Sequence, residues 1–393
     1  MRVQGAPGAP VILRPAAGLN VQINGPLLID GSRDLVVEGF RVSNPTGIAI
    51  ALRDGSERVT VRSMEAVDSE LGIWIGSHAR GRHIVENCLV SRNLKHGMAV
   101  DAINLSAGSE TVFRNNVISD NGQHGIELNG SYYIFERNTV FRNGFRLGGT
   151  TGIHLYAKDE NEGTGSFNII RYNVSYENGD LRQFDGNGIQ LDRWCDNNLV
   201  HHNLSFNNDG AGINVFHSTG NRLYNNTLFG NMKDRYRIHP QYIKGDLVLV
   251  NDFDLKPRMA SADVANNIIV TTSANVSPIV LDRFSKSAVA FRSNQVEKRT
   301  SGPLIMTRDE ALTIAALNML NAKSQGNVEA AAQFSSAAPS KVEDFVPPVS
   351  ASSRGRGVDV GLDRDLRGKA YPVERPGRGA LALDATTSDR PRG

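Results

Sequence analysis

The chain has 393 residues, and its 43 Lys and Arg residues nearly balance 41 Asp and Glu residues, for a formal net charge of +2 at pH 7. Acids and bases are interspersed, which argues against nucleic acid or a membrane surface as a partner. Hydrophobic residues make up 40% of the sequence, enough for a large core, but no run is long enough to span a bilayer. The length allows several ordinary domains or one elongated repeat domain.

A repeated unit dominates the first two thirds of the chain. A Gly-apolar pair recurs every 24 to 28 residues, once after 36, at Gly47, Gly72, Gly97, Gly125, Gly152, Gly188 and Gly212. Each unit runs on through two further apolar stretches, and each of these ends in an Asn. Three short alternating strands cannot enclose a core alone, so we expect the units to stack in register. The period of two excludes a helical solenoid.

The repeats resemble the right-handed parallel β-helix of pectate lyases and other polysaccharide-active proteins over residues 10–295. The resemblance implies an all-β fold of three-strand coils with a ladder of buried asparagines, whose amides bond to one another and to the turns. The predicted ladder is Asn87, Asn116, Asn138, Asn173, Asn203 and Asn226. Several of these lie in N-x-[ST] patterns, but a ladder Asn would be inaccessible to glycosylation.

The later part of the chain divides the protein into three predicted parts: a β-helix over residues 1–300, a helical insertion and loop over residues 301–350, and a cap over residues 351–393. The stretch "TRDEALTIAALNML" predicts the helix, because Thr307 and Glu310 have the spacing of a capping box before apolar residues at helical spacing. The final segment resembles the closing segment of many secreted bacterial β-helix proteins. It would cover exposed strand edges at the open end of the stack.

The beginning of the chain, "MRVQGAPGAP", has no apolar signal-peptide core and reads as a coil already under way. A leader missing from the chain fits this start better than a cytoplasmic protein. We therefore expect a secreted or periplasmic protein that is a monomer, with a homotrimer as the alternative.

The two cysteines, Cys88 and Cys195, lie four coils apart in this scheme. At about 4.8 Å per strand they would be nearly 20 Å apart, well beyond the roughly 7 Å that a disulfide allows between Cα atoms. We expect free thiols, and the C-x-x-C and paired-His signatures of zinc are missing.

The strand after each repeated Gly predicts the functional face, because in this fold its outward side chains usually line the substrate groove. Small residues on the first rungs give way to ionisable and amide residues on the central ones. The strand "TGIHLYAKDE" places His154, Tyr156 and Lys158, three residues that can move protons, in one row. His96 and His124 could be turn formers, and any one residue could be an ordinary solvated side chain. The cluster over four consecutive rungs favours a site.

The resemblance implies a lyase that cleaves a uronate-containing acidic polysaccharide by β-elimination. That reaction needs a base for the proton α to the carboxylate, an acid for the O4 leaving group, and a group that neutralises the carboxylate. The predicted catalytic residues are the base His154, the acid Tyr156, and Lys158. The predicted substrate-binding residues are Trp74, His124, Asn129, Gln190, Arg193, Asn214 and Phe216. The neutralising group is either Ca²⁺ held by Asp101, Glu127, Asp185 and Asp192, or the direct donors Asn129, Gln190 and Arg193.

Three other functions stay open. The stretch "NGIQLDRWCDNNLVHHNLSFNNDGAGI" is similar to coils of mannuronan-type C5 epimerases, although their Asp-Pro-His-Asp signature is absent. A glycoside hydrolase would use two carboxylates such as Glu127 and Asp192. A non-catalytic carbohydrate-binding β-helix would use the same face only to hold sugar. The insertions "AKDENEGTGS" and "ENGDLRQFDGN" flank the His154 and Asp192 rungs as groove walls, which favours an enzyme.

Overall fold

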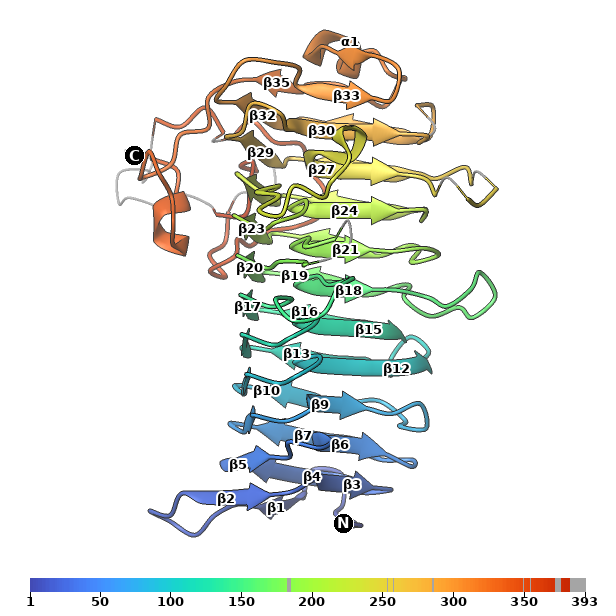
Figure 1. The fold of residues 1–393 in the computed structure, drawn as a ribbon, viewed down its shortest axis with the longest axis vertical. Helices are drawn as coiled ribbons and strands as arrows, with labels where there is room; N and C mark the ends of the chain where they lie inside the picture. Colours follow the sequence, from blue (N-terminus) through green and yellow to red (C-terminus); the bar gives the residue numbers. More distant parts are fainter. Residues whose placement is uncertain are drawn as a thin grey trace, which may run out of the picture.

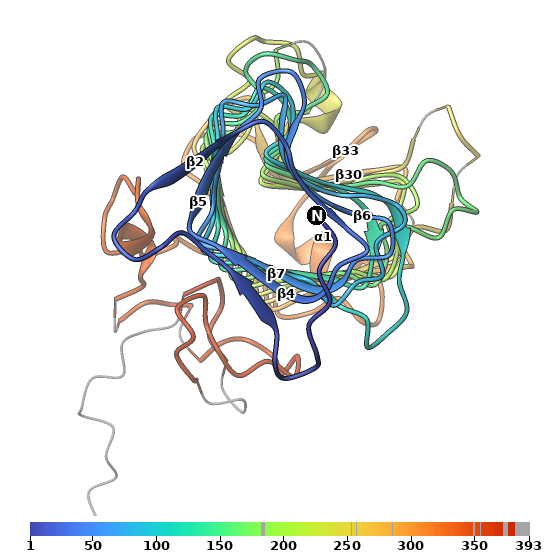
Figure 2. The same cartoon turned by 90° about the horizontal axis from the view of Figure 1, so that it is seen from below.

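A computed structural model of the protein shows one tall stack of coils (Figure 1). Most coils contribute one strand to each of three sheets, and a view along the stack shows the sheets enclosing a common interior (Figure 2). This arrangement confirms the predicted parallel β-helix. The structure describes residues 1–181, 185–252, 254–256, 258–284, 286–348, 350–353, 355–371 and 376–381.

The three sheets are parallel throughout, except that β33 and β34 pair antiparallel. Sheet 1 contains β1 (Val11–Leu13), β4 (Arg33–Glu38), β7 (Glu57–Arg62), β10 (Ile84–Glu86), β13 (Thr111–Arg114), β16 (Tyr133–Glu136), β19 (Ile169–Arg171), β22 (Leu199–His201), β25 (Asn221–Tyr224), β28 (Ala262–Ala265) and β31 (Val289–Arg292). Sheet 2 contains β2 (Val21–Asn24), β5 (Phe40–Ser43), β8 (Glu65–Val67), β11 (Leu89–Ser91), β14 (Val117–Ser119), β17 (Thr139–Phe141), β20 (Val174–Tyr176), β23 (Leu204–Phe206), β26 (Thr227–Phe229), β29 (Ile268–Thr271), β32 (Gln295–Lys298) and β35 (Val328–Glu329). Sheet 3 contains β3 (Leu27–Asp30), β6 (Ile48–Arg53), β9 (Leu71–Ile75), β12 (Met98–Asn104), β15 (Ile126–Ser131), β18 (Ile153–Leu155), β21 (Ile189–Leu191), β24 (Ile213–Phe216), β27 (Gly245–Val250), β30 (Ser277–Asp282), β33 (Ile305–Thr307) and β34 (Ala311–Leu312).

The apolar alternation of the repeats forms the interior of the stack. One inward row of sheet 3 consists of Ile73, Met98, Ile126, Ile153, Ile189 and Ile213, which are partners on successive strands and almost fully buried. Burying each such side chain contributes about 1.5–3 kcal/mol. The repeated apolar position therefore holds neighbouring coils together and fixes their register.

The repeated glycine before this row leaves room for the turn packed against it. A Cβ on Gly152 would lie 2.6 Å from Asn178 Nδ2 and 2.7 Å from the carbonyl oxygen of Gly188. A Cβ on Gly188 would lie 2.0 Å from Ser205 Oγ. The sequence repeats Gly because a side chain would collide there with the next coil.

A ladder of buried asparagines lines the turn between sheets 1 and 2, as predicted. Each Nδ2 donates to the Oδ1 of the next residue at 2.8–3.0 Å along Asn116, Asn138, Asn173, Asn203, Asn226, Asn267, Asn294 and Asn327. None of these side chains is more than 3% exposed, which leaves no access for glycosylation.

Asn87 does not belong to the ladder, contrary to the prediction. It is exposed with φ of 55°, and the ladder position of its coil is Cys88, whose backbone N–H donates to Asn116 Oδ1 at 3.0 Å. The stretch "VENCLV" has one Asn where "FRNNVI" has two, and the second of those two is the ladder residue. A thiol cannot replace an amide that donates and accepts, so the ladder begins at Asn116.

A second ladder was not predicted and lines the turn between sheets 2 and 3. Its amides bond at 2.8–3.0 Å along Asn93, Asn121, Asn143, Asn178, Asn208 and Asn231. The last amide donates to Asp246, and burial raises the pKa of that carboxyl to about 6. Two ladders fix two of the three corners of each coil, which keeps the outward side chains between them in register.

Removing one amide from the ladder should destabilise the protein. Asn173→Ala leaves the donor of Asn138 and the acceptor side of Asn203 buried without their partner, which should cost about 1–3 kcal/mol. Thermal or denaturant unfolding measures the loss, with the exposed Asn20→Ala as the matched control. Equal stability of the two variants would contradict a structural role for the ladder.

The Gly47 repeat is out of register by two residues, contrary to the prediction. Ala51, rather than Ala49, lies opposite Trp74. β6 has six residues and β9 has five. Because β6 is a longer apolar strand, its Gly-apolar pair resembles the other pairs in sequence, although it lies two residues away from their position in the stack.

The chain after residue 300 first adds further strands to the stack and then runs outside the stack. β33 and β35 add to sheets 3 and 2, and the predicted helix is the five-residue α1 (Ile314–Asn318) at the end of the stack (Figure 1). Its cap is Thr313, whose side chain accepts from Ala316 N–H, and not Thr307, which closes the β33–β34 turn. Two 3₁₀ turns complete the described elements, η1 (Gln241–Ile243) and η2 (Val342–Phe345).

The C-terminal segment covers the side of the stack and not its open end, contrary to the prediction. Figure 1 shows it beside the strands of sheet 2. Phe345, Leu366 and Leu381 pack in one cluster with the outward residues Phe206 and Phe229. The apolar outer face of sheet 2 requires this cover, whereas α1 lies at the end of the stack. Residues 354, 372–375 and 382–393 of the predicted cap lie outside the described residues.

Both cysteines are buried free thiols, as predicted. Burial raises the pKa of Cys88 to about 12 and that of Cys195 well above its ordinary value. Neither is therefore a nucleophile. Among the described residues, no helix has the length and hydropathy to cross a membrane.

Candidate active site

The candidate site occupies the outer face of sheet 3 on three adjacent strands, β15, β18 and β21. Glu127, His154 and Gln190 are partners across these strands and form one row. The inward residues Leu128, Leu155 and Leu191 follow, also as partners. The next outward row is therefore Asn129, Tyr156 and Asp192. The structure thus brings six of the predicted site residues onto a grid whose strands lie about 4.8 Å apart.

Four rings stack across this grid. The centroids of His96 and His124 are 5.2 Å apart, those of His124 and His154 are 4.4 Å apart, and those of His154 and Tyr156 are 5.6 Å apart. Neighbouring planes differ by at most 20°. The stack fixes the ring orientations before any substrate binds.

His124 is a neutral ring with a fixed tautomer. The backbone N–H of Thr151 donates to its Nδ1 at 2.9 Å, so the remaining proton is on Nε2. Burial, together with the charges of His154 and His96, lowers the pKa of His124 well below its ordinary value. His124 therefore supports the His154 ring without placing a charge beside it.

His96 and Glu127 form a close polar pair at one end of the stack. Nε2 of His96 lies 2.7 Å from Glu127 Oε2. Burial raises the pKa of Glu127, but the hydrogen bond and charge of His96 and the charge of His154 lower it more. Glu127, on the first of the three strands, is accordingly an ionised carboxylate.

His154 and Asp192 form the central pair. Nε2 of His154 lies 3.3 Å from Asp192 Oδ2, and its Nδ1 is buried with no hydrogen-bond partner among the described residues. Burial lowers the pKa of His154, but the hydrogen bond to Asp192 and the charges of Asp192, Glu127 and Asp185 raise it more. Asp192 therefore stabilises the imidazolium form, in which Nε2–H donates to Oδ2, and so makes His154 a stronger base.

Tyr156 lies next to His154 on the outer face, just beyond the end of β18. Burial raises its pKa, and the charges of Glu127 and Asp101 add to this against a hydrogen bond with Asn129 that lowers it. The phenol therefore keeps its proton at neutral pH. Lys158 lies further along, on an exposed loop.

Three predicted substrate-binding residues are buried and position their neighbours instead. His124, Asn129 and Gln190 are only 3–4% exposed. Gln190 Oε1 accepts from Thr151 Oγ1 at 3.0 Å and from Asn187 Nδ2 at 2.6 Å. The tight turns and the stack of rings cover these side chains, which sequence alternation alone does not reveal.

The other predicted substrate-binding residues flank the grid on the same face. Trp74, two rungs before Glu127, lies over Gly76, where a Cβ would meet its indole at 2.7 Å. Asn214 is the partner of Gln190 on β24.

Phe216 lies at the end of β24, under the Arg193 guanidinium at 5.1 Å from the ring centroid. Arg193 also pairs with Asp252, and its side chain is 42% exposed. These positions extend the face along the stack and supply a partly exposed guanidinium on the residue after Asp192.

No three of the four acids predicted to hold Ca²⁺ bring their ligand atoms together among the described residues. Glu127 pairs with His96, Asp192 pairs with His154, and Asp101 is exposed on an irregular part of β12. Burial and the charge of Asp192 raise the pKa of Asp185 to about 6. Calcium needs six to eight converging oxygens, so this arrangement does not fit it.

A transition metal does not fit either. One ligand atom each of His124, Glu127 and His154 lies within 4.8 Å of the others. However, Thr151 N–H occupies the Nδ1 lone pair of His124, and Nε2 carries the proton. A ligating histidine needs a free lone pair on one nitrogen and a donor on the other.

Sequence reasoning missed three residues of the site, Thr151, Asn187 and Asp252, and weighed His96 mainly as a turn former. His96, Thr151 and Asn187 share a signal, since each directly precedes a repeated glycine, as His124 does. The residues before the repeated glycines lie beside the site, because the turn that contains them leads directly into the strand that carries the site. Residues 182–184 of the second predicted groove wall lie outside the described residues.

Comparison with known proteins supports the fold. The family described as right handed beta helix region matches residues 25–176. Comparison with curated proteins gives no match.

Three solved structures are similar to this chain. The A-module of the mannuronan C-5 epimerase AlgE6 of Azotobacter vinelandii is similar over 80% of both chains, with 15% identity and a TM-score of 0.57. A mutant of the PL6 family alginate lyase AlyGC is similar over 99% of this chain and 54% of its own, with 14% identity and a TM-score of 0.53. A PL6 family polysaccharide lyase from Pseudopedobacter saltans is similar over 96% of this chain and 91% of its own, with 12% identity and a TM-score of 0.51. At these identities the likeness concerns the fold, and the chain is a right-handed parallel β-helix protein.

Proposed function

We propose that this protein is a polysaccharide lyase that cleaves a uronate-containing polymer by β-elimination on the outer face of sheet 3. The observation that carries the proposal is the His154–Asp192 pair beside the protonated Tyr156, with the partly exposed Arg193 directly after Asp192. The similar structures named for alginate lyase and mannuronan epimerase activity support a uronate polymer as the substrate. A substrate of this kind is consistent with a secreted or periplasmic protein.

In the proposed mechanism, neutral His154 carries its proton on the buried Nδ1 and takes the proton α to the uronate carboxylate on Nε2. Asp192 then faces the imidazolium that forms and stabilises it. Arg193 binds the carboxylate, so that the negative charge that develops there meets a fixed cation.

Tyr156 completes the elimination by donating its phenolic proton to O4 of the leaving sugar. Its raised pKa keeps it protonated until this step. The C4–O4 bond breaks as the double bond forms, and the phenolate recovers its proton from water.

C5 epimerisation is the second candidate, because it begins with the same proton abstraction. The similar AlgE6 module supports it. The two reactions differ only after abstraction, in whether O4 leaves or the opposite face of the ring is protonated. A hydrolase is less favoured, since the lowered pKa of Glu127 is opposite to what a general acid needs.

The deciding experiment incubates the purified protein with a panel of uronate polymers and neutral polysaccharides. A lyase gives unsaturated ends that absorb in the ultraviolet, with uronate polymers alone. Solvent deuterium at C5 without cleavage would indicate an epimerase. New reducing ends without ultraviolet absorbance would indicate a hydrolase, and binding without any product a carbohydrate-binding protein.

The pH dependence should report the base and the acid. Because the pKa of His154 is raised, its basic form is lost as pH falls, and kcat/KM should rise with pH through a midpoint above the ordinary histidine value of about 6.5. Tyr156 has a raised pKa, so the falling limb should lie above the ordinary tyrosine value of about 10. Asp192→Asn should move the rising limb to lower pH. An unmoved rising limb in that variant would contradict the assignment.

Activity should persist in excess chelator. Arg193 provides the neutralising charge in this proposal, and neither the four acids nor the His124–Glu127–His154 group fits a cation. Turnover is measured with and without chelator, and with calcium added back as the control. Loss of activity that calcium restores would return the neutralising role to a metal.

A further inference from the structure

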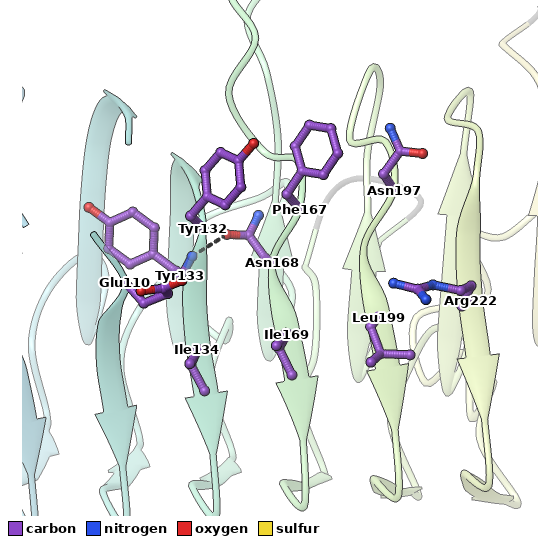
Figure 3. A pocket seen from close by; sticks show the side chains of 10 residues that line it. All are labelled: Glu110, Tyr132, Tyr133, Ile134, Phe167, Asn168, Ile169, Asn197, Leu199 and Arg222. Carbon is purple, nitrogen blue, oxygen red and sulfur yellow. Dashed lines mark hydrogen bonds between the residues drawn. The ribbon is translucent and has the colours of Figure 1, made fainter. Parts of the chain in front are cut away.

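A second surface feature lies around the corner from the candidate site, on the outer face of sheet 1. It is a hollow of about 280 Å³, hereafter the trough, which spans β13 to β25 (Figure 3). It is lined by Glu110, Tyr132, Tyr133, Ile134, Phe167, Asn168, Ile169, Asn197, Leu199 and Arg222. Five strands at about 4.8 Å spacing make it roughly 20 Å long, the length of several sugar units rather than one.

The floor of the trough is an apolar strip. Ile134, Ile169 and Leu199 are partners on three successive strands, and each is partly exposed. Elsewhere this outer face carries Arg–acid pairs, such as Arg114 with Glu86 and Arg171 with Glu136. The apolar row continues on the earlier strands through Val112, Ile84 and Thr60, so the strip is the later part of a long apolar row that runs beside these pairs.

Two aromatic rings stand side by side above this strip (Figure 3). Tyr132 and Phe167 are nearly parallel, at 7°, with centroids 5.2 Å apart, and Phe167 is 48% exposed. Both have left-handed backbone, with φ of 63° and 58°, a conformation that bulky residues seldom adopt. Buried Asn168 holds the corner, since its Oδ1 accepts from Tyr133 N–H at 2.8 Å. The rings are thus fixed in place while half-open to solvent.

A cation closes one end of the trough. Arg222 is the partner of Leu199 on β25 and is exposed. It has no ion pair among the described residues, because the neighbouring Asp263 pairs with Arg292. At the other end, Glu110 turns its carboxylate to the backbone N–H of Gly108, at 2.8 Å. The trough thus carries a cation at the Arg222 end and a carboxylate at the Glu110 end.

We propose that the trough binds a segment of an acidic polysaccharide, with sugar rings against Tyr132 and Phe167 and a carboxylate at Arg222. Aromatic faces take the apolar side of a sugar ring, and a guanidinium forms paired hydrogen bonds with a carboxylate. The choice of a uronate polymer rests on the proposed function. The loop between β18 and β19 connects the two sites, because Glu162 approaches Asn129 at the candidate active site and Phe167 lies at the trough. A polymer held in the trough would be kept close to the catalytic face.

The test measures binding of a uronate polymer and a neutral polymer by calorimetry, in the His154→Ala background so that nothing is cleaved. Phe167→Ala should weaken binding of the uronate polymer by about tenfold. Arg222→Gln should weaken it severalfold and reduce its salt dependence. Ile12→Ala and Arg14→Gln, exposed residues on and beside the first strand of the same sheet, are the matched controls. With His154 intact, both trough variants should raise KM for the polymer and leave kcat, and turnover of a uronate trisaccharide, unchanged.

The outcomes separate this proposal from the proposed function. Wild-type turnover of a uronate polymer with unchanged binding in both trough variants would overturn the trough and leave the lyase. Binding that depends on Phe167 and Arg222 without any turnover would support the trough and overturn the lyase. Equal binding of the neutral polymer would overturn the acidic ligand. Self-association of the wild type that both variants abolish, seen by ultracentrifugation, would make the trough a contact between copies and overturn the proposal.

Discussion

His154→Ala is expected to lower turnover of a uronate polymer by about 10²–10⁴-fold, the usual cost of losing a positioned base. Polymer binding should change little, because Trp74, Phe216 and Arg193 on the flanking rungs remain. The reason is geometric: Asp192, whose Oδ2 lies 3.3 Å from Nε2 of His154, stabilises the imidazolium that forms. In the rest of the stack, Nδ1 of His124 accepts from Thr151 N–H, and Nε2 of His96 is bonded to Glu127. Initial rates and polymer affinity are measured on the same preparation.

Two controls separate this chemical role from damage to the stack. His78→Ala removes an exposed histidine from the turn after β9 and should leave turnover unchanged. His154→Gln keeps a polar side chain beside Asp192 but no base, so it should be as inactive as His154→Ala. Full activity in either His154 variant would remove this residue from the catalytic set and leave the base to be sought elsewhere on the face.

The architecture could be predicted because each coil repeats the same physical problem. Three features recur with a regular period: a Gly where the next coil leaves no room, two apolar positions that face the interior, and an Asn at each turn. This pattern alone predicts three-strand coils. The ladder could be predicted for Asn173 and Asn203 because a buried amide needs equal amides above and below.

Single-residue register could not be predicted where two neighbours both fit the pattern. Asn87 and Cys88 compete for one ladder position, and only the backbone shows that Asn87 takes the left-handed turn. The same ambiguity displaced Gly47 by two residues. The repeat determines how many residues separate equivalent positions, but the length of each strand determines which residue occupies each position.

The chemistry of the site could be predicted only in part from the sequence, for a different reason. Alternation places Glu127, His154, Tyr156 and Asp192 on one face, but it does not show pairing between rungs. His96 bonds to Glu127, and His154 to Asp192, so two of the four acids predicted to hold calcium are paired with histidines instead. Partners that lie 31 and 38 residues apart in sequence are brought together only by stacking of the coils.

Tyr156→Phe is expected to reduce formation of unsaturated product by about 10²–10⁴-fold while leaving proton abstraction intact. The phenolic hydroxyl is the proposed donor to O4, and phenylalanine keeps the ring that stacks on His154 at 5.6 Å. With His154 and Asp192 unchanged, the α proton should still be removed and returned, so solvent deuterium should enter C5 of the uncleaved polymer. Mass spectrometry of the recovered polymer detects that exchange, and ultraviolet absorbance follows cleavage. The double variant His154→Ala with Tyr156→Phe is the control and should show neither. Loss of both exchange and cleavage in Tyr156→Phe alone would mean that Tyr156 takes part in the abstraction itself, and undiminished cleavage would place the acid on another residue.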